Sequence, residues 1–400
     1  MNSLHAGFSA SRLTIARRYR RKTKAALAAL LELSPRSVTA FEDGTRRPLH
    51  GNVLKMSSWL GFPVEWFYAP HVDLLEPESL SFRSRRSMTA TLRNRANAAS
   101  AIATAVISPA FNSRFNLPSL DVPDLSGEEP EAAAQILRHH WKLGLWPIAN
   151  MVHLLEAKGV EVYWWNEDSP CVDAVSMWRN NKPFVMLNQH KGYGDRDRWN
   201  AAHELGHLTL HRRELIADGR KVEAEADRFA AAFLLPAAAF RLDSPKQPVL
   251  RRYFDLKRKW GVSIAAMVRR SKDLYIFTEW QYDCACKEIS WRGWRSQEPV
   301  EVAILPEQSA SHTDILKFLS TKGIYAERIA TQLHLTVTDF IEAVPLSADY
   351  CQFNPAKREP RQDRPDLRLL PSIYNGEKSH SEQDYEADEA NDRPKLLIAL

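Results

Sequence analysis

The sequence predicts an α+β protein: an all-α bundle, then a central unit with a small antiparallel sheet, then a helical C-terminal region. Three observations support this prediction. Short, capped amphipathic segments fill residues 9–68. Between residues 131 and 210, two helical segments precede three alternating segments and a further helix, which is the order of a sheet packed against helices. Residues 250–344 return to helical periodicity.

The N-terminal module is expected to contain four short helices. Thr23 and Ser34 are good N-cap residues, and Pro35 follows at a first helical position. Gly44 then ends the third helix. The expected segments are Ser11–Arg21, Thr23–Leu31, Ser34–Asp43 and Asn52–Leu60.

Positive charge is concentrated in this module. Residues 1–60 hold eleven Lys and Arg against three acidic residues, a net charge of +8, whereas the whole chain carries +5. The remainder is therefore slightly acidic. A basic module on a near-neutral body indicates a polyanionic partner, and double-stranded DNA is the expected one.

Two helices joined by a short turn suit a helix-turn-helix, whose second helix enters the major groove. The stretch TKAALAALLELSPRSVTAFEDGTRRP (residues 23–48) resembles the XRE-type helix-turn-helix family. It departs from the family at Lys24, where glutamine is usual, and at Glu32, where glycine is usual. A bundle used for dimerisation or partner docking is the alternative. The expected base-facing residues are Arg36, Ser37 and Thr39, and the expected phosphate contacts are Lys24, Arg46 and Arg47.

The central unit begins with two helices, expected at Glu131–Leu143 and Ile148–Lys158. Three strands follow, at Val160–Trp165, Val172–Trp178 and Pro183–Leu187, and Asn180-Asn181 suits the turn between the last two. We expect an antiparallel sheet that forms one wall of a cleft. An edge strand there could bind an extended peptide as an additional strand.

The segment His203-Glu204-Leu205-Gly206-His207 matches the HExxH pattern. Helical positions i and i+4 share one face, so both imidazoles can point at one ion. Glu204 lies beside them and can reach a water molecule as a carboxylate base. The alternative is a pair of histidines on a half-buried helix face with a solvated glutamate between them.

A second helix is expected after a turn at residues 217–219, ending at Pro236. Glu223 and Asp227 are four residues apart and share a face. Glu223 can supply the third ligand, and Asp227 can accept the far N–H of a ligating histidine. Glu225 is a rival ligand that points about 200° away from Glu223. The predicted ion is Zn²⁺, with Mn²⁺ as an alternative.

Residues 81–236 resemble the ImmA/IrrE family of metallopeptidases. The likeness is carried by PEAAAQILRHHWKLGLWPIANMVHLLEAKGVEVYW, VDAVSMW, AAHELGHLTLH and EAEADRFAAAFLLP. Asp227 stands where asparagine is usual. The resemblance implies a zincin-like domain in which His203, His207 and Glu223 hold the metal and Glu204 is the general base. It also implies a narrow protein substrate, a helix-turn-helix repressor whose cleavage releases stress-response or mobile-element genes. Because a broadly active protease would be harmful in the cytoplasm, we expect low basal activity and a trigger.

The domain organisation follows from these segments. Residues 83–86 are an arginine cluster expected at a helix start, and residues 326–341 read as two short packed helices rather than a second helix-turn-helix. The expected parts are a helix-turn-helix domain (1–70), a helical connector (71–115), a peptidase domain (116–245), a C-terminal helical domain (246–350) and a disordered tail (351–400).

Cysteine usage and hydropathy bear on location. The chain has four cysteines without a C-x-x-C pair, which is typical of a reducing cytoplasm. Residues 96–110 form the longest small, apolar run, and polar residues interrupt it, so neither a membrane segment nor a signal peptide is expected. A homodimer is compatible with the bundle. The alternative function is an antitoxin-like DNA-binding regulator in which the peptidase domain is a sensor or a remnant.

Overall fold

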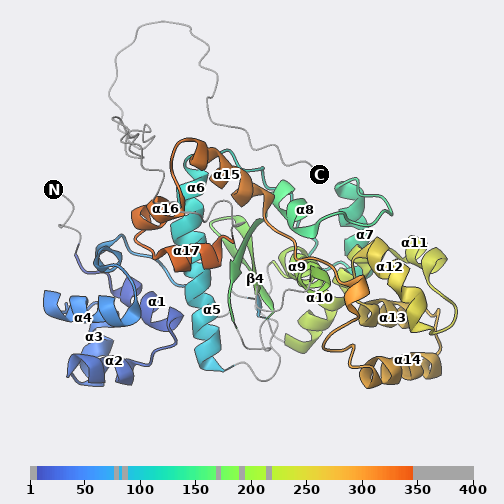
Figure 1. Cartoon of the computed structure of the whole chain (residues 1–400), viewed down its shortest axis with the longest axis horizontal. Helices are drawn as coiled ribbons and strands as arrows, with labels where there is room; N and C mark the ends of the chain where they lie inside the picture. Colours follow the sequence, from blue (N-terminus) through green and yellow to red (C-terminus); the bar gives the residue numbers. More distant parts are fainter. Residues whose placement is uncertain are drawn as a thin grey trace, which may run out of the picture.

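The computed structural model describes residues 7–75, 81–82, 89–167, 173–188, 194–212 and 219–345. Figure 1 shows the basic module at one end, a central sheet and a helical cluster at the other end. The predicted arginine cluster at 83–86 and the predicted tail at 351–400 lie outside the described residues, as does most of the turn at 217–219. None of the described helices is both long and apolar enough to cross a membrane.

The N-terminal module contains the four predicted helices. The side chain of Thr23 accepts a hydrogen bond from the Ala26 N–H, and that of Ser34 accepts one from the Ser37 N–H, so both predicted N-caps form. Glu32 ends the second helix with φ of 57°, the left-handed conformation for which glycine is usual. The helices are α1 (Ala10–Tyr19), α2 (Lys24–Leu31), α3 (Pro35–Glu42) and α4 (His50–Leu60), followed by the 3₁₀ turn η1 (Val64–Tyr68).

The helical connector predicted at residues 71–115 contains a helix that is not uniform. Helix α5 (Ala90–Ile102) continues into a π-helical turn, η3 (Ala103–Ile107), and then into α6 (Ser108–Asn112). Within this π turn, the Thr104 hydroxyl donates to the Ser100 carbonyl at 2.7 Å. Helix α1 packs along α5, which attaches the basic module to the rest of the molecule (Figure 1).

The sheet is mixed, so the prediction of an antiparallel sheet was wrong. Its strands lie in the order β1-β3-β4-β2: β1 (Ser81–Phe82), β3 (Ala174–Arg179), β4 (Lys182–Asn188) and β2 (Glu161–Trp165). Asn180 and Asn181 have φ of 50° and 60° and form the predicted tight turn between β3 and β4. That hairpin places β4, rather than β3, next to β2. The neighbours β2 and β4 therefore run parallel.

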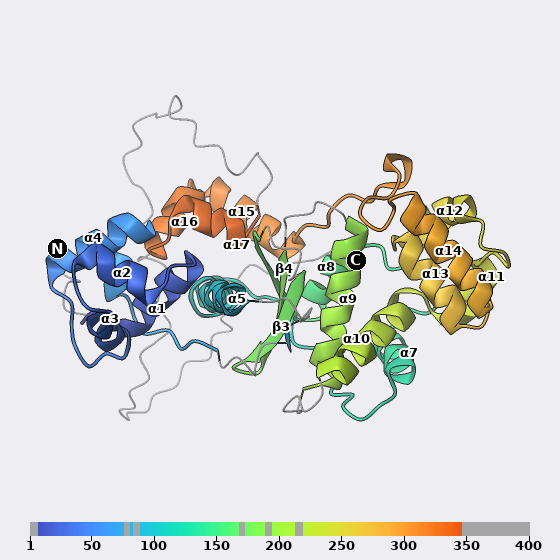
Figure 2. The same ribbon diagram turned by 90° about the horizontal axis from the view of Figure 1, so that it is seen from below.

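Each face of the sheet belongs to a different hydrophobic core. Val175 and Met177 face the core shared with α1 and α5, whereas Ala174 and Val185 face a second core on the other side of the sheet. This alternation follows the two-residue period of a strand. The result is a three-layer arrangement, with α5 on one side of the sheet and α9 (Gly194–Leu210) on the other (Figure 2).

The second core is helical. Helix α10 (Gly219–Leu234) crosses α9 closely, because a Cβ on Gly206 would lie only 3.1 Å from Phe229 and 3.3 Å from Ala226. Helices α7 (Pro130–His140), α8 (Met151–Ala157), α11 (Ala237–Asp243), α12 (Tyr253–Trp260), α13 (Ile264–Asp273) and α14 (Glu279–Trp291) complete this side, with a 3₁₀ turn, η5, at Leu250–Arg252.

The last helices return to the first core. After the 3₁₀ turn η6 (Val300–Val302) come α15 (Ala310–Thr321), α16 (Ala326–Gln332) and α17 (Val337–Ala343). Buried Glu156 accepts hydrogen bonds from the backbone N–H groups of Ala310 and Ser311 at the start of α15. Residues 246–345 thus contribute to both cores, and the domain boundaries remain predictions.

Candidate metal centre

Helix α9 supplies the two histidines. It begins with Asp195 and Asp197 in its first turn, where negative charge favours a helix N-terminus. His203 and His207 follow nine and thirteen residues after the first residue of the helix, Gly194, and are 0% and 4% exposed. Both rings contact side chains of α10: His203 lies near Glu223 and Asp227, and His207 lies near Glu223.

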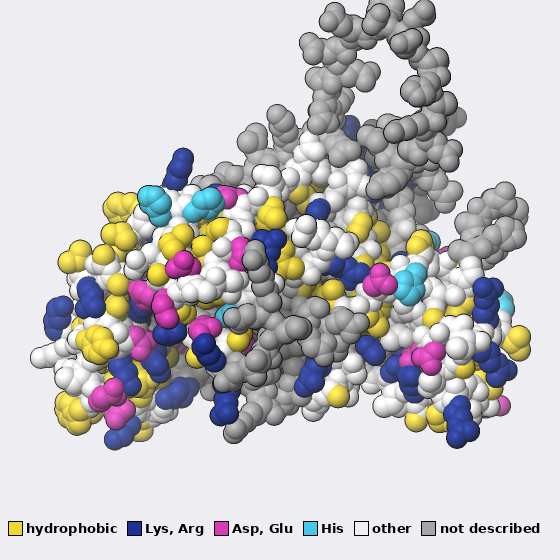
Figure 3. Space-filling model, turned by 180° about the vertical axis from the view of Figure 1, so that it is seen from behind, with side chains coloured by type: hydrophobic (Ala, Val, Ile, Leu, Met, Phe, Trp, Pro, Cys, Tyr) yellow, Lys and Arg dark blue, Asp and Glu magenta, His cyan; other side chains and the backbone are white. Residues whose placement is uncertain are grey.

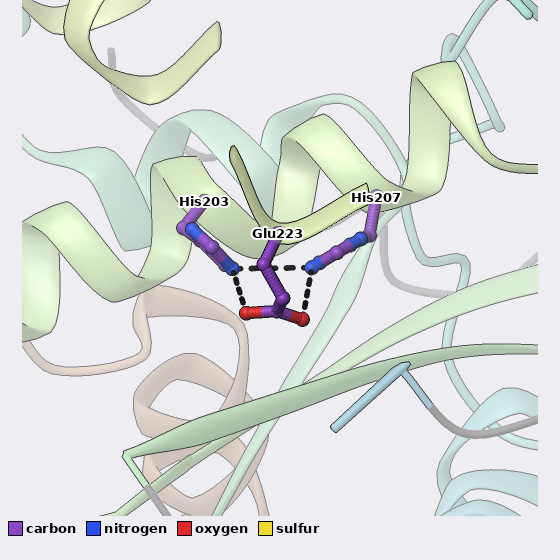
Figure 4. Close-up of side chains that lie close together, drawn as sticks. All are labelled: His203, His207 and Glu223. Carbon is purple, nitrogen blue, oxygen red and sulfur yellow. Dashed lines mark hydrogen bonds and ion pairs between the residues drawn. The ribbon is translucent and has the colours of Figure 1, made fainter. Parts of the chain in front are cut away.

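His203, His207 and Glu223 converge on one point (Figure 4). The two Nε2 atoms are 3.1 Å apart, and each lies 3.5 Å from one oxygen of Glu223. Donor atoms that bind one ion tetrahedrally, at about 2.0–2.2 Å each, are separated by roughly 3.3–3.6 Å. Two nitrogens and a carboxylate are also donors that Zn²⁺ prefers. The three residues therefore fit a divalent transition-metal ion.

The charges of these groups follow from their contacts. Burial raises the pKa of Glu223, but hydrogen bonds with His203 and His207 outweigh it and bring that pKa to about 2. Burial lowers the pKa of His203, but hydrogen bonds with Asp227 and Glu223 raise it to about 9. The pKa of His207 is lowered, chiefly by burial. Glu223 is thus a carboxylate and His207 a neutral ring.

The far nitrogens of both rings are held as well. His203 Nδ1 lies 2.8 Å from Asp227 Oδ1, which is the contact that the sequence spacing predicts. His207 Nδ1 lies 3.1 Å from His211 Nδ1, and His211 Nε2 lies 3.1 Å from Glu225 Oε2. Glu225, the rival ligand, therefore contacts His211 and is not one of the three clustered donors. Such contacts fix which ring nitrogen carries the proton.

Glu204 is fully buried and lies against the sheet. Its Oε2 accepts a hydrogen bond of 2.6 Å from the hydroxyl of Ser176 in β3. Ser176 itself is 1% exposed and shares the α9-facing side of the strand with Ala174. Sequence reasoning missed this contact, because a serine within an alternating strand carries no motif. His211 was missed too, although its position four residues after His207 was a usable signal.

A cavity of about 310 Å³ opens beside the centre. Its lining includes Asp227, Asn200 and two half-buried aromatic residues, Trp199 and Trp294. The remaining wall comes from Asp173, the first turn of α9, helices α12 and α13 with Ser263 between them, and residues 294–303. The centre therefore adjoins a space large enough for an amino-acid side chain, and aromatic and polar groups line it.

The residues predicted to contact DNA lie on the outer part of the basic module. Arg36, Arg46 and Arg47 are exposed, and Ser37 and Thr39 are half-buried on α3. Lys24 is engaged within the module, since its Nζ lies 3.2 Å from Thr39 Oγ1 and 3.4 Å from Glu42. Lys and Arg side chains are spread over this end of the molecule in Figure 3.

Comparison with known families identifies the central part of the chain. Residues 156–272 match the peptidase family model described as the IrrE N-terminal-like domain. The match spans β2, β3, β4, α9 and α10, and so includes both histidines, Glu204 and Glu223. No curated protein matches the chain. The predicted resemblance is therefore confirmed for residues 156–236, and the family match extends neither to residues 81–155 nor to the basic module.

Proposed function

We propose that this chain, which carries an IrrE N-terminal-like peptidase domain, is a zinc-dependent endopeptidase that acts as a regulator. The observation that carries the proposal is the buried triad of His203, His207 and Glu223, with Glu204 held beside it by Ser176. A pair of histidines on a half-buried face would not need a third donor from a second helix. Here Glu223 comes from α10 and reaches both rings.

The residues divide the chemical work. A divalent ion, when held by the triad, supplies a Lewis acid for peptide hydrolysis. Glu204 accepts a proton from the attacking water and delivers it to the leaving amine. The Ser176 hydroxyl donates a hydrogen bond to Glu204 Oε2 and so orients the carboxylate. This orientation also sets the direction of the other carboxylate oxygen, Oε1. Asp227 and the His211–Glu225 pair hold the ligand rings in place.

The proposed substrate is a helix-turn-helix repressor, whose cleavage would release stress-response or mobile-element genes. Support comes from the family resemblance and from the placement of the centre on a chain with its own basic helical module. A single attached module restricts the peptidase to partners or DNA sites that the module binds. This arrangement suits a narrow substrate better than general proteolysis.

The test is co-expression of this protein with repressors encoded near its gene. The wild type should produce a discrete fragment, and Glu204→Gln should not, although it should bind the ion almost as well. Glu279→Gln is the matched control, because Glu279 is exposed at the start of α14 and is not part of the lining of the cavity beside the triad. Equal fragment yields from the wild type and Glu204→Gln would rule the peptidase out.

The second candidate is an antitoxin-like DNA-binding transcriptional regulator. It is favoured by the exposed arginines Arg36, Arg46 and Arg47 next to the capped helices α2 and α3. Operator-like DNA should be retained at low salt and released steeply as salt rises. Arg46→Ala with Arg47→Ala should reduce retention at least tenfold, whereas exposed Arg251→Ala, outside the module, should not. A lack of retention even at low salt would remove this candidate.

A further inference from the structure

A second cavity lies between α6, β2 and the start of α15. Its volume is about 210 Å³, and it shares no lining residue with the cavity beside the triad. The ring of His312 in α15 lies 5.8 Å from that of Phe111 in α6, and both residues line the cavity (Figure 1). An engineered apolar protein cavity of about 150 Å³ binds benzene. The space therefore suffices for one aromatic ring with a small substituent.

One wall of this cavity is the segment 117–120, which is fixed by a close backbone contact. Gly159 has φ of 76°, and a Cβ on it would lie only 2.6 Å from the carbonyl oxygen of Ser119. Next to this contact, the Asp121 N–H donates to the Lys158 carbonyl at 3.0 Å. The segment 117–120 is thus held against the residues that lead into β2, and it encloses the cavity rather than filling it.

The carboxylates and the lysine that line the cavity already have partners. Glu161 accepts hydrogen bonds from the side-chain amide of Asn112 at 2.9 Å and from the hydroxyl of Tyr163 at 3.0 Å. Lys182 Nζ donates to Asn112 Oδ1 at 2.7 Å and lies 3.7 Å from Glu161 Oε1. Glu156 accepts three hydrogen bonds from the start of α15. Among the described residues, these groups leave no charge for a ligand of the cavity to neutralise.

The polar group that still needs a partner is the imidazole of His312. The residue is 5% exposed, and within the described part of the chain its Nδ1 has no hydrogen-bond partner. Burial lowers the pKa of His312 to about 3, so the ring is neutral and has one donor and one acceptor nitrogen. A buried nitrogen without a partner costs free energy, which a bound hydrogen-bonding group recovers.

We propose that this cavity is a binding site for a small neutral aromatic molecule of the phenol class, whose hydroxyl pairs with His312 Nδ1. A hydroxyl can both donate and accept, so it suits either tautomer of the imidazole. The aromatic ring contacts Phe111, Tyr163 and Ile315, which are all buried and line the cavity. The alternative partner of the nitrogen is an internal water molecule. This binding site is independent of the proposed peptidase function.

The test is calorimetric titration of the full chain with phenol and with toluene, which has nearly the same shape but no hydrogen-bonding group. Both probes are titrated into the wild type, His312→Phe and His50→Phe. The ratio of phenol affinity to toluene affinity should be at least tenfold higher in the wild type than in His312→Phe, because only the wild type offers the nitrogen. His50 is exposed and does not line the cavity, so His50→Phe should keep the wild-type ratio.

Three results of these titrations would overturn the proposal. The first is that the wild type binds no phenol at millimolar concentration, which would leave water as the partner of His312. The second is an unchanged ratio in a folded His312→Phe protein, because phenol would then not pair with the imidazole. The third is tighter binding of benzylamine than of phenol, since benzylamine is positively charged at neutral pH and the proposed ligand is neutral.

A second variant tests the location without changing His312, in case His312→Phe does not fold. Leu117 is half-buried in the cavity wall, and Leu117→Trp fills part of the space, so both probes should bind at least tenfold more weakly. Leu242 is 88% exposed on α11, and Leu242→Trp should bind both probes as the wild type does. Unchanged affinities in Leu117→Trp would place the bound phenol elsewhere and overturn the proposal. These titrations measure no cleavage, so their outcome is separate from that of the peptidase test.

Discussion

At the scale of single residues, the relay from His207 determines which of its nitrogens can bind an ion. For His207 Nε2 to bind an ion, His207 Nδ1 must carry the ring proton and donate a hydrogen bond to His211 Nδ1. His211 must then carry its own proton on Nε2 and donate a hydrogen bond to Glu225. Both links are 3.1 Å long. Glu225 is therefore a positioning residue that acts on the metal centre through His211.

Glu225→Ala removes the final acceptor of this relay and should lower metal affinity about tenfold, in line with the usual effect of losing a contact behind a ligand. The affinity is measured by competition with a chelating dye. Lys221→Met is the control, because Lys221 is 75% exposed and pairs with Glu225 at 3.7 Å without touching the histidines. An unchanged affinity for Glu225→Ala would show that His211 does not need the carboxylate.

The pKa values of His203 and Glu223 predict that binding of the ion releases a proton. Without metal, the His203 ring is protonated at pH values below its pKa of about 9. Glu223 is ionised at pH values above its pKa of about 2, and so it is a carboxylate near neutral pH. Binding through His203 Nε2 must therefore release about one proton near pH 7.5, and affinity should fall about tenfold for each pH unit below that value. Calorimetry in two buffers of different ionisation enthalpy counts the proton. Binding without proton release would contradict the assigned charge of His203.

At the scale of the elements, the crossing of α9 and α10 sets the distance from Glu223 to the rings. Gly206 lies at the closest point, where a Cβ would meet Phe229 and Ala226 at 3.1 and 3.3 Å. These neighbours belong to α10, the helix that carries Glu223. A glycine between the two histidines thus does more than leave room: it allows the two helices that share the metal ligands to approach each other.

Gly206→Val should separate the helices, lower stability by roughly 1–3 kcal/mol and reduce metal affinity more than tenfold. Gly51→Ala is the contrasting change, because a Cβ there meets nothing within 4 Å; it should stabilise the chain by about 0.5–1 kcal/mol and leave metal binding unchanged. Urea unfolding and dye competition measure the two effects. Wild-type metal affinity in a folded Gly206→Val protein would show that the crossing does not control the site.

At the scale of the molecule, buried charge pairs connect the basic module to the distant C-terminal helices. Both terminal nitrogens of Arg20 donate to the carboxylate of Asp339 at 2.6 Å, although 319 residues separate the two in sequence. Arg21 and Arg95 both donate to Glu167, which is 1% exposed at the end of β2. The module is thus bound to the body that holds the peptidase sheet.

Arg20→Met leaves the Asp339 carboxylate, 2% exposed, without its bidentate partner and should cost about 1–3 kcal/mol, less than a fully buried pair because 28% of the Arg20 side chain is exposed. In a double-mutant cycle with Asp339→Asn, the coupling energy should be at least about 1 kcal/mol. Exposed Arg251→Met should have almost no effect. Strict additivity of the two changes would mean that the pair does not stabilise the docked module.

By itself, the sequence determined the parts that depend on local spacing. Thr23 and Ser34 cap their helices, Asn180 and Asn181 turn the hairpin, and His203 and His207 share a helix face, because each depends on residues within a few positions of one another. The four-residue spacing from Glu223 to Asp227 also identified the partner helix. These features could be predicted because helix and turn geometry are periodic and local.

Only the tertiary structure decided the rest. The parallel pairing of β2 with β4, the contact of Ser176 with Glu204 and the pairing of Ser81 with Ser176 join segments whose spacing follows no period. The same is true of Arg20 and Asp339, at opposite ends of the described chain. Such contacts depend on which surfaces exclude water together, and that depends on packing of the whole molecule rather than on any one stretch of sequence.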